Sequence, residues 1–228
     1  MESYVFTLFL VHFFSFWIFC GIFYYYDRKF IQKSIKNKEK YIKAVKNTLF
    51  NQLFMSLPIL YLCEDNIESI ILNANNYGLL RNILNVFFIG NLSNIIFYII
   101  HRIFHINYFY KKIHMIHHEF IEPVAPSALY AHPVEHIFAN TLPFLLAYLI
   151  CGGCSYYITI ILMCFSSFIT TIAHVNHDID FFGNGHILHH KYFKYNFGFG
   201  GYLDKFFNTD YDKLNNKDYN KYVEDINS

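Results

Sequence analysis

The histidines of this sequence are crowded into one part of the chain, where they recur at fixed spacings. Of thirteen histidines, all but His12 lie between residues 101 and 190. They form an HxxxH pair and two HxxHH groups: His101 and His105; His114, His117 and His118; His186, His189 and His190. On a helix, such spacings place imidazoles on one face, a turn apart. Imidazole binds transition metals through one ring nitrogen while a hydrogen bond fixes the other. Eight clustered imidazoles are too many for one tetrahedral ion, so the pattern predicts a two-metal site.

The composition indicates that a membrane protein carries these histidines. Hydrophobic residues make up 54% of the chain and charged residues 15%, whereas soluble domains contain about 25% charged residues. The 27 Phe and 20 Tyr residues suit membrane interfaces. A net charge of +1 gives no basic field and hence no case for a nucleic-acid partner.

Apolar runs are the elements that must position the histidines, and their arrangement predicts the topology. The runs cover residues 5–26, 48–63, 83–100, 137–150 and 155–173. The lysine-rich stretch 27–47 marks the cytosolic side, because basic residues beside membrane spans stay there. Five spans, with the amino terminus outside, then place every histidine cluster on the cytosolic side. If the short run 48–63 does not cross fully, the first pair becomes a re-entrant hairpin and the clusters still share a side.

The predicted fold class is therefore an all-α integral membrane protein. We expect a transmembrane helical bundle of about four to five spans, with a cytosolic, histidine-rich helical metal-binding cap. His12 lies alone inside the first apolar run, and we expect it to be hydrogen-bonded to a neighbouring helix. Cys151-Gly-Gly-Cys154 has CxxC spacing without a second pair, so we interpret it as a tight turn between two apolar segments.

A metal pair held by neutral imidazoles keeps a high positive charge, and with iron the expected chemistry is O₂ activation and attack on a lipid C–H bond. The sequence contains no flavin, haem or nucleotide motif, so the electrons must come from a partner. Nearby acids could orient imidazole N–H groups: Glu119, Glu122, Glu135, Asp178 and Asp180. An alternative of another class is a non-catalytic, histidine-rich membrane protein that binds or transports zinc. Transport sites usually lie near the bilayer midplane, whereas these histidines lie beyond the ends of the apolar runs.

The three ordered clusters resemble the fatty acid hydroxylase superfamily, which includes sterol desaturases, C4-methylsterol oxidases and lipid hydroxylases. Residues around the second cluster, Lys111-Lys112-Ile113 and Glu119-Phe120, look like the methylsterol oxidase version, as does 130–135 (YAHPVE). His174-Val-Asn176 and the ending 203–209 (LDKFFNT) are similar to further family motifs, with Asn208 where Gly is usual.

The resemblance implies two iron ions (with zinc possible in a purified form), O₂, and electrons passed from NAD(P)H through cytochrome b5 or a reductase. It carries the ligand role onto nine residues: His101, His105, His114, His117, His118, His174, His186, His189 and His190. Possible further ligands, or groups behind the ligands, are His177, His132, His136, Glu135 and Asp178.

The resemblance also suggests an organisation and a substrate. We expect N-terminal membrane spans and a basic cytosolic loop over 1–82, a hydroxylase-like catalytic domain over 83–210 and a polar tail over 211–228. The best substrate hypothesis is a C4-methylsterol in sterol biosynthesis, in the endoplasmic reticulum membrane. The alternatives within the superfamily are a fatty-acyl or sphingoid-base hydroxylase and a sterol desaturase.

Overall fold

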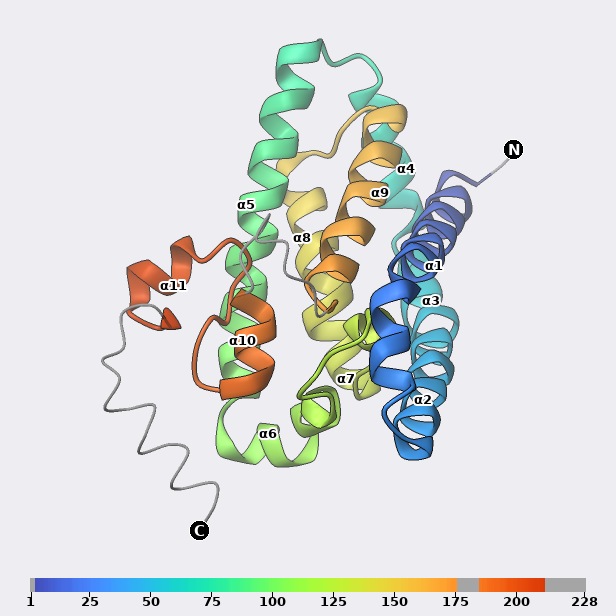
Figure 1. The fold of residues 1–228 in the computed structure, drawn as a ribbon. Coiled ribbons are helices and arrows are strands. Elements are labelled where there is room, and N and C mark those ends of the chain that lie inside the picture. The colour runs from blue at the N-terminus through green and yellow to red at the C-terminus, as the bar shows by residue number, and fades with distance from the viewer. Residues whose placement is uncertain (1–2, 176–184, 212–228) are drawn as a thin grey trace.

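Long helices run side by side to form the body of the molecule (Figure 1). The structure is a computed structural model that describes residues 3–175 and 185–211, and the described residues contain helices and no strand. The elements in chain order are α1 (Tyr4–Ile31), α2 (Ile35–Asn51), η1 (Gln52–Ser56), α3 (Leu57–Leu62), α4 (Glu64–Ala74), α5 (Leu79–Phe104), α6 (Asn107–Lys112), η2 (His114–Glu119), η3 (Ala125–Leu129), α7 (Pro133–Glu135), η4 (His136–Thr141), α8 (Leu142–Cys151), α9 (Tyr156–Ile172), α10 (Gly185–Tyr192) and α11 (Tyr202–Phe207). The all-α prediction is confirmed.

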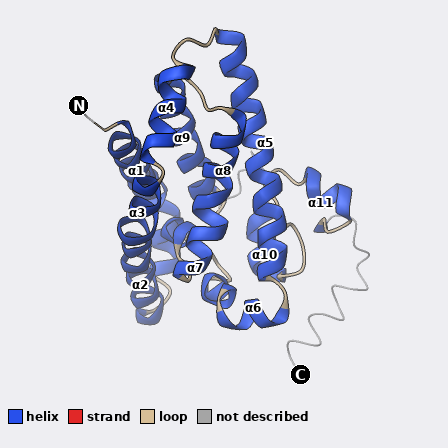
Figure 2. Ribbon diagram, turned by 180° about the vertical axis from the view of Figure 1, so that it is seen from behind, coloured by secondary structure: helices blue, strands red, loops and turns tan. Residues whose placement is uncertain are grey.

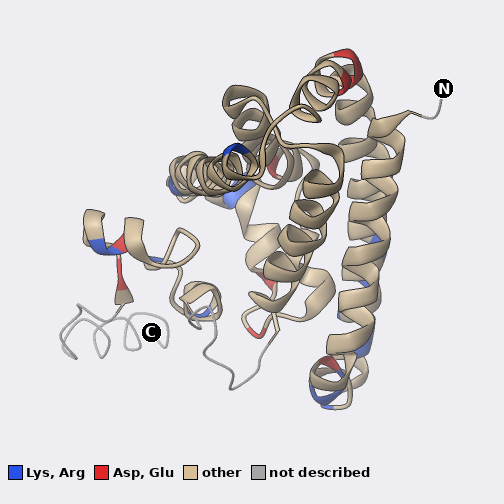
Figure 3. Cartoon of the chain, turned by 90° about the horizontal axis from the view of Figure 1, so that it is seen from above, with Lys and Arg blue, Asp and Glu red and all other residues tan. Residues whose placement is uncertain are grey.

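Three helical segments of the described chain are long and apolar enough to cross a membrane: Tyr4–Ile31, Leu79–Phe104 and Pro133–Cys151. The apolar helix α9 has 17 residues. The predicted run 48–63 is divided among the end of α2, the π-helical η1 and the short α3, and it is not among the three. Long stretches of the ribbon carry no charged residue (Figure 3). Three candidate spans are thus established by length and composition, and the larger number stays a prediction.

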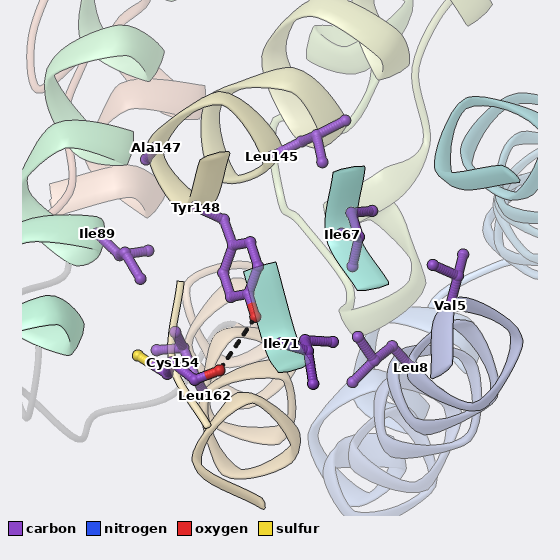
Figure 4. Close-up of a cluster of buried hydrophobic side chains, with 10 residues drawn as sticks. All are labelled: Val5, Leu8, Ile67, Ile71, Ile89, Leu145, Ala147, Tyr148, Cys154 and Leu162. Atoms are coloured by element: carbon purple, nitrogen blue, oxygen red, sulfur yellow. Dashed lines mark hydrogen bonds between the residues drawn. The ribbon is translucent and has the colours of Figure 1, made fainter. Parts of the chain in front are cut away.

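The bundle has an apolar core away from the histidine-rich segments (Figure 4). Buried side chains from α1, α4, α5, α8, α9 and the turn between α8 and α9 meet there: Val5, Leu8, Ile67, Ile71, Ile89, Leu145, Ala147, Tyr148, Cys154 and Leu162. Helix α1 is therefore part of the same packed bundle as the later helices. It also contacts α9 through His12, whose Nδ1 lies 3.1 Å from Ser167 Oγ, as predicted for this histidine.

The Cys151-Gly-Gly-Cys154 segment forms the expected tight turn between α8 and α9. Gly152 and Gly153 have φ angles of 75° and 60°, in the left-handed region that favours glycine. The Tyr148 hydroxyl closes the turn by donating to the Cys154 carbonyl at 3.3 Å (Figure 4).

Alanine substitutions at the two glycines are expected to differ in their effect on stability. A Cβ on Gly152 would meet only the Tyr77 hydroxyl at 3.5 Å, whereas a Cβ on Gly153 would lie 2.7 Å from Tyr148 Cζ. Both variants strain the backbone equally, but only Gly153→Ala also overpacks the core. We expect it to lower the free energy of unfolding by about 1–3 kcal/mol more than Gly152→Ala. Thermal or denaturant unfolding in detergent measures the difference, and equal losses would contradict the crowding argument.

Candidate metal centre

Nine histidine side chains converge into two adjacent groups. The five-histidine group contains His101, His105, His114, His118 and His189, and the four-histidine group contains His117, His174, His186 and His190. Within each group, one nitrogen from every ring lies within 4.8 Å of the others. These are the nine residues to which the resemblance gave the ligand role. Both groups are thus able to hold a metal ion.

The elements that carry these residues meet at one end of the bundle. Helix α5 ends at Phe104, and α6 leads directly into η2. In Figures 1 and 2, α6, α7 and α10 lie at the end of the bundle opposite the α4–α5 connection. The predicted site therefore lies where apolar helices end, rather than midway along them.

Each HxxHH motif divides its histidines between the two groups. The i and i+4 members stay together: His114 and His118 in the five-histidine group, and His186 and His190 in the four-histidine group. The i+3 member crosses over, so His117 joins the four-histidine group and His189 the five-histidine group. The second cluster lies on a 3₁₀-helix, η2, rather than on the α-helix that we expected from its spacing. Because of the crossover, each group contains histidines from both η2 and α10.

Hydrogen bonds fix three rings of the five-histidine group from behind. His101 Nδ1 donates to the Phe197 carbonyl at 2.7 Å, and His189 Nδ1 donates to the Tyr195 carbonyl at 2.6 Å. His114 Nδ1 lies 2.6 Å from Glu135 Oε1. A carbonyl oxygen can only accept, so the proton of His101 and of His189 resides on Nδ1. The Nε2 atom of each ring is left with a free lone pair.

Hydrogen bonds from Nδ1 to backbone carbonyls also fix two rings of the four-histidine group. His117 Nδ1 donates to the Tyr130 carbonyl, and His174 Nδ1 donates to the Thr170 carbonyl, both at 3.0 Å. The two Nε2 atoms face each other 3.5 Å apart. Since both protons are on Nδ1, neither Nε2 can donate to the other.

The distances between facing ring nitrogens show whether the residues fit a metal ion. In the five-histidine group, His101 Nε2 and His114 Nε2 are 3.1 Å apart, and His114 Nε2 and His118 Nε2 are 3.0 Å apart. A metal bound at about 2.0–2.1 Å to each nitrogen separates neighbouring ligand atoms by about 3.0–3.4 Å. The observed separations match this spacing, and a cation between the lone pairs would remove their mutual repulsion. The donor set fits a metal ion, and imidazole accepts iron and zinc alike.

Buried nitrogens without a partner give an independent indication of a metal. Both ring nitrogens of His186 and of His190 are buried and have no hydrogen-bond partner among the described residues. His118 Nδ1 is also buried and has no hydrogen-bond partner among the described residues. A buried polar atom left without a partner costs about 1–3 kcal/mol. In the four-histidine group, a bound cation would offset that cost at the ring nitrogens of His186 and His190 that bind it.

Burial keeps the rings in the neutral form that binds metal. It lowers the pKa of His117 to about 4. Burial, with the neighbouring His117, lowers the pKa of His174 to about 3. Burial also lowers the pKa of His189 and His190 well below the ordinary value, and other histidines nearby add to the effect. The rings are therefore uncharged at neutral pH and need not lose a proton before they bind a cation.

Helix α2 supports the loop that orients His117. Asn51 Nδ2 donates to the carbonyls of Leu129 and Ala131, at 3.2 and 3.0 Å, and so holds the chain on both sides of Tyr130. The Thr48 hydroxyl donates to the Pro126 carbonyl at 2.8 Å. A helix that carries no ligand thereby fixes the carbonyl that sets the orientation of a ligand ring.

The segment after α10 holds the Phe197 carbonyl that orients His101 in the five-histidine group. The buried Asp204 carboxylate accepts from the backbone N–H groups of Phe197 and Gly198, at 2.8 and 2.9 Å, and from the Thr209 hydroxyl at 2.7 Å. Asn94 of α5 pairs in both directions with the backbone of Phe199, at 2.8 and 2.9 Å. These bonds hold Phe197 where its carbonyl accepts from His101.

Replacing Asp204 with asparagine is expected to lower metal occupancy. One of the two carboxylate oxygens becomes an NH₂ group, so at least one of the three donors loses its acceptor and the segment that contains Phe197 is less well fixed. Changes behind a metal ligand typically cost 10–100-fold in affinity, and we expect about tenfold here. Metal per chain, measured by mass spectrometry after equilibration at graded metal concentrations, reports the loss. Asp65→Asn, at an exposed aspartate of α4, is the control, and equal occupancy in both variants would contradict the role of Asp204.

Among the described residues, the possible further ligands named from the sequence belong to neither histidine group. Glu135 contacts His114, as described above. His132 lies in neither group and its Nδ1 accepts from the Val134 N–H at 3.2 Å, at the start of α7. His136 is buried but also lies in neither group, with its Nε2 2.8 Å from Ser56 Oγ. His177 and Asp178 lie outside the described residues.

The sequence did not single out Asn94 or Asn51. For Asn94 a signal was present, because it interrupts an apolar run and a polar side chain within such a run needs a partner. Asn51 carried the same signal, because it lies inside the apolar run 48–63.

Comparison with known proteins gives one family for the region that carries the site. The family model for fatty acid hydroxylase matches residues 86–209. No solved structure matches the chain.

Three curated relatives illustrate the range of similarity. Fatty acid hydroxylase domain-containing protein 2 of Macaca fascicularis is 38% identical over 136 residues, which are 58% of this chain and 40% of that protein. Methylsterol monooxygenase 1 of Gallus gallus is 28% identical over 138 residues, 50% of this chain and 43% of that protein. Sphinganine C4-monooxygenase 1 of Arabidopsis thaliana is 46% identical over 56 residues, 24% of this chain and 22% of that protein. The chain therefore spans less than half the length of each of these relatives.

Proposed function

This chain belongs to the fatty acid hydroxylase family, and from that premise we propose that it is an O₂-dependent membrane oxidase that uses two iron ions to oxidise a C–H bond of a lipid. The observation that carries the proposal is the pair of adjacent histidine groups, five rings and four, whose facing lone pairs fit two cations. Three apolar helices long enough to cross a membrane are consistent with a lipid substrate.

In this proposal the nine histidines are the metal ligands. Iron at these positions would supply O₂ activation and oxidation of the substrate carbon. The protein's part is to hold the rings in one tautomer, through the carbonyls of Phe197, Tyr195, Tyr130 and Thr170, and to keep water away from them. Most of the ligand rings are buried, and His189 and His190 are fully inaccessible.

In this proposal Glu135, ionised when cations are bound, supplies negative charge to a site otherwise made of neutral rings; without a cation, burial favours the protonated form of its carboxyl group. Its carboxylate touches His114, and it is 3% exposed. A carboxylate behind an imidazole raises the basicity of the ring and fixes its orientation. We assign Glu135 this positioning role at the five-histidine group.

The electrons must come from outside the chain, since its sequence has no motif for a redox cofactor other than the histidines. The partner in this proposal is cytochrome b5 or a reductase that draws on NAD(P)H. The proposed location is the endoplasmic reticulum membrane, with both histidine groups on the cytosolic side, because the lysine-rich segment 27–47 favours that orientation.

The proposed substrate is a C4-methylsterol, which the similarity to a methylsterol monooxygenase and the motifs around the second histidine cluster both favour. A second candidate, a sphingoid base, is favoured by the 46% identity to a sphinganine C4-monooxygenase over a short region. Both candidates require the same two metals, and they differ in the shape of the lipid.

Lipid profiling in cells that lack their own C4-methylsterol oxidase tests the proposal. The intact chain is expressed beside a His117→Ala control, and sterols, acyl chains and sphingoid bases are measured by mass spectrometry. Loss of accumulated 4-methylsterols with the intact chain alone supports the sterol proposal. New hydroxylation of sphingoid bases or acyl chains instead would move the chain to the second candidate or to the acyl hydroxylases. No change in any pool, for a protein purified without bound metal, would overturn the proposed function.

A further inference from the structure

Hydrogen-bonding side chains link α1, α9, η1 and η4 inside the bundle. His12 and Ser15 of α1 contact Ser167 of α9, with atoms 3.1 and 2.9 Å apart. Trp17 Nε1 of α1 donates to Gln52 Oε1 of η1 at 2.9 Å. We call this set, completed by two residues described next, the interior polar line: His12, Ser15, Trp17, Gln52, Ser56, His136 and Ser167.

The interior polar line leads toward the metal centre. Ser56, four residues after Gln52, lies 2.8 Å from His136 Nε2 and 3.3 Å from the Thr141 hydroxyl. His136 directly follows Glu135, which contacts His114 of the five-histidine group. Both η1 and η4 are π-helical, a conformation that is rare and frequent at functional sites.

Gln52 has a hydrogen-bond donor that nothing in the described structure uses. Its side chain is completely buried, and Nε2 has no partner among the described residues. Leaving such a group without a partner costs about 1–3 kcal/mol. The missing partner must be an acceptor, because the amide nitrogen carries two N–H groups and no lone pair for bonding.

Trp17 connects this buried amide with the outer face of α1. It is the only tryptophan in the chain, and it lies near the middle of the 28-residue α1. Tryptophan is usually found at the ends of spans, where one side is wet. Trp17 is half-buried, whereas its neighbours Phe14 and Ile18 are 57% and 60% exposed. Its ring thus lies at the boundary between the lipid-facing surface and Gln52.

We propose that Gln52 and Ser56 bind an oxygen atom of the lipid substrate, a hydroxyl or a carbonyl, with Trp17 as the side chain that moves aside to admit it. Gln52 Nε2 donates to this oxygen, and Ser56 Oγ accepts when the oxygen carries a proton. The proposal rests on the proposed function in taking the ligand to be the lipid that is oxidised. It restricts the substrate to lipids whose oxygen can enter the apolar part of the bundle, and it excludes pure hydrocarbons.

Trp17 fluorescence provides the test, because every tryptophan photon comes from this one position. The full chain is reconstituted into phosphatidylcholine vesicles, which contain no other protein, and titrated with three probes: lanosterol, sphinganine and 5α-cholestane, which lacks oxygen. We expect lanosterol or sphinganine to change the emission of Trp17 saturably, and cholestane to leave it unchanged. The titration is run without reductant, so binding is observed whether or not the chain oxidises the probe.

Two variants separate binding from structure. Gln52→Met keeps the volume of the side chain but removes both the Nε2 donor and the Oε1 atom that accepts from Trp17, whereas Ser56→Ala removes a partner of the lipid oxygen and leaves the Trp17–Gln52 bond intact. Each is expected to raise the half-saturating mole fraction of the oxygen-bearing probe about fivefold, the loss of one net hydrogen bond. Asn91→Leu is the control, since among the described residues Asn91 bonds to the backbone of its own helix, at Phe87.

The proposal is overturned if cholestane gives the same response as the other probes, if no probe gives a saturable response, or if both variants bind like the unaltered chain. Saturable binding without any oxidised product when reductant is supplied would leave this proposal standing and count against the proposed function.

Discussion

His189→Ala is expected to abolish lipid oxidation and to empty the five-histidine group, while the chain still inserts into membranes. His189 is fully buried, and its Nε2 lies 3.1 Å from the Nε2 atoms of both His105 and His118. Removing the ring takes one metal-binding nitrogen from the group and removes the hydrogen bond between His189 Nδ1 and the Tyr195 carbonyl. Because a change merely behind a ligand costs up to about 100-fold, we expect the loss of a ligand to exceed about 100-fold in metal affinity.

Metal per chain and product formation are measured together for this variant. Lys191→Ala, an exposed residue of the same helix, is the control and should retain both. Membrane fractionation shows whether insertion is intact. A His189→Ala protein that kept two metals per chain and full turnover would exclude His189 as a ligand.

Glu135→Gln is expected to weaken metal binding in the five-histidine group about 10–100-fold. The variant keeps the shape of the side chain and an oxygen that can accept from His114 Nδ1, but it removes the negative charge. The second oxygen, Oε2, is buried without a partner among the described residues, so the charge has no other obvious use there. Glu135→Leu, which also removes the acceptor, should bind metal more weakly still.

A metal titration of the apoprotein, followed by competition with a chelator, ranks the variants. Glu39→Gln, in the exposed part of α2, serves as the control. If Glu135→Gln bound metal like the unaltered chain and only Glu135→Leu were impaired, then orientation and not charge would be the contribution of Glu135.

Spacing along the chain was enough to predict which residues converge. His101 and His105 are separated by one helical turn, as are His114 and His118, and each pair shares a group. The family pattern added His174, which no local spacing had paired with another histidine. The turn at Gly152 and Gly153 was also predictable, because two adjacent glycines between apolar runs allow the left-handed conformation that the chain adopts there.

Which group each histidine joins could not be predicted. His117 and His118 are neighbours in sequence, yet they belong to different groups: His118 Nε2 lies 3.1 Å from His189 Nε2, whereas the His117 ring lies against the His190 ring, with centroids 4.6 Å apart. That arrangement depends on tertiary contacts, such as the Tyr130 carbonyl that receives His117 Nδ1. A single sequence does not reveal these contacts.

Asn208 shows how a departure from the family pattern is accommodated. It occupies a position where the resembling family usually has glycine, and its φ angle is 54°. Asparagine adopts this left-handed conformation more readily than other residues with a side chain. The turn after α11 therefore keeps its shape, and Thr209 still reaches Asp204.

The crossing of His117 and His189 between the groups has a consequence for the order in which the protein is made. Chains emerge amino terminus first, so the candidate spans in α1, α5 and Pro133–Cys151 are synthesised before α10. Each group needs at least one histidine from α10 for its full set of ligands. Neither can be complete while the ribosome is still translating residue 185. In the proposed enzyme, the complete ligand sets could therefore form only late in biogenesis, after the spans have been handed to the membrane, and the two groups become complete within a few codons of each other.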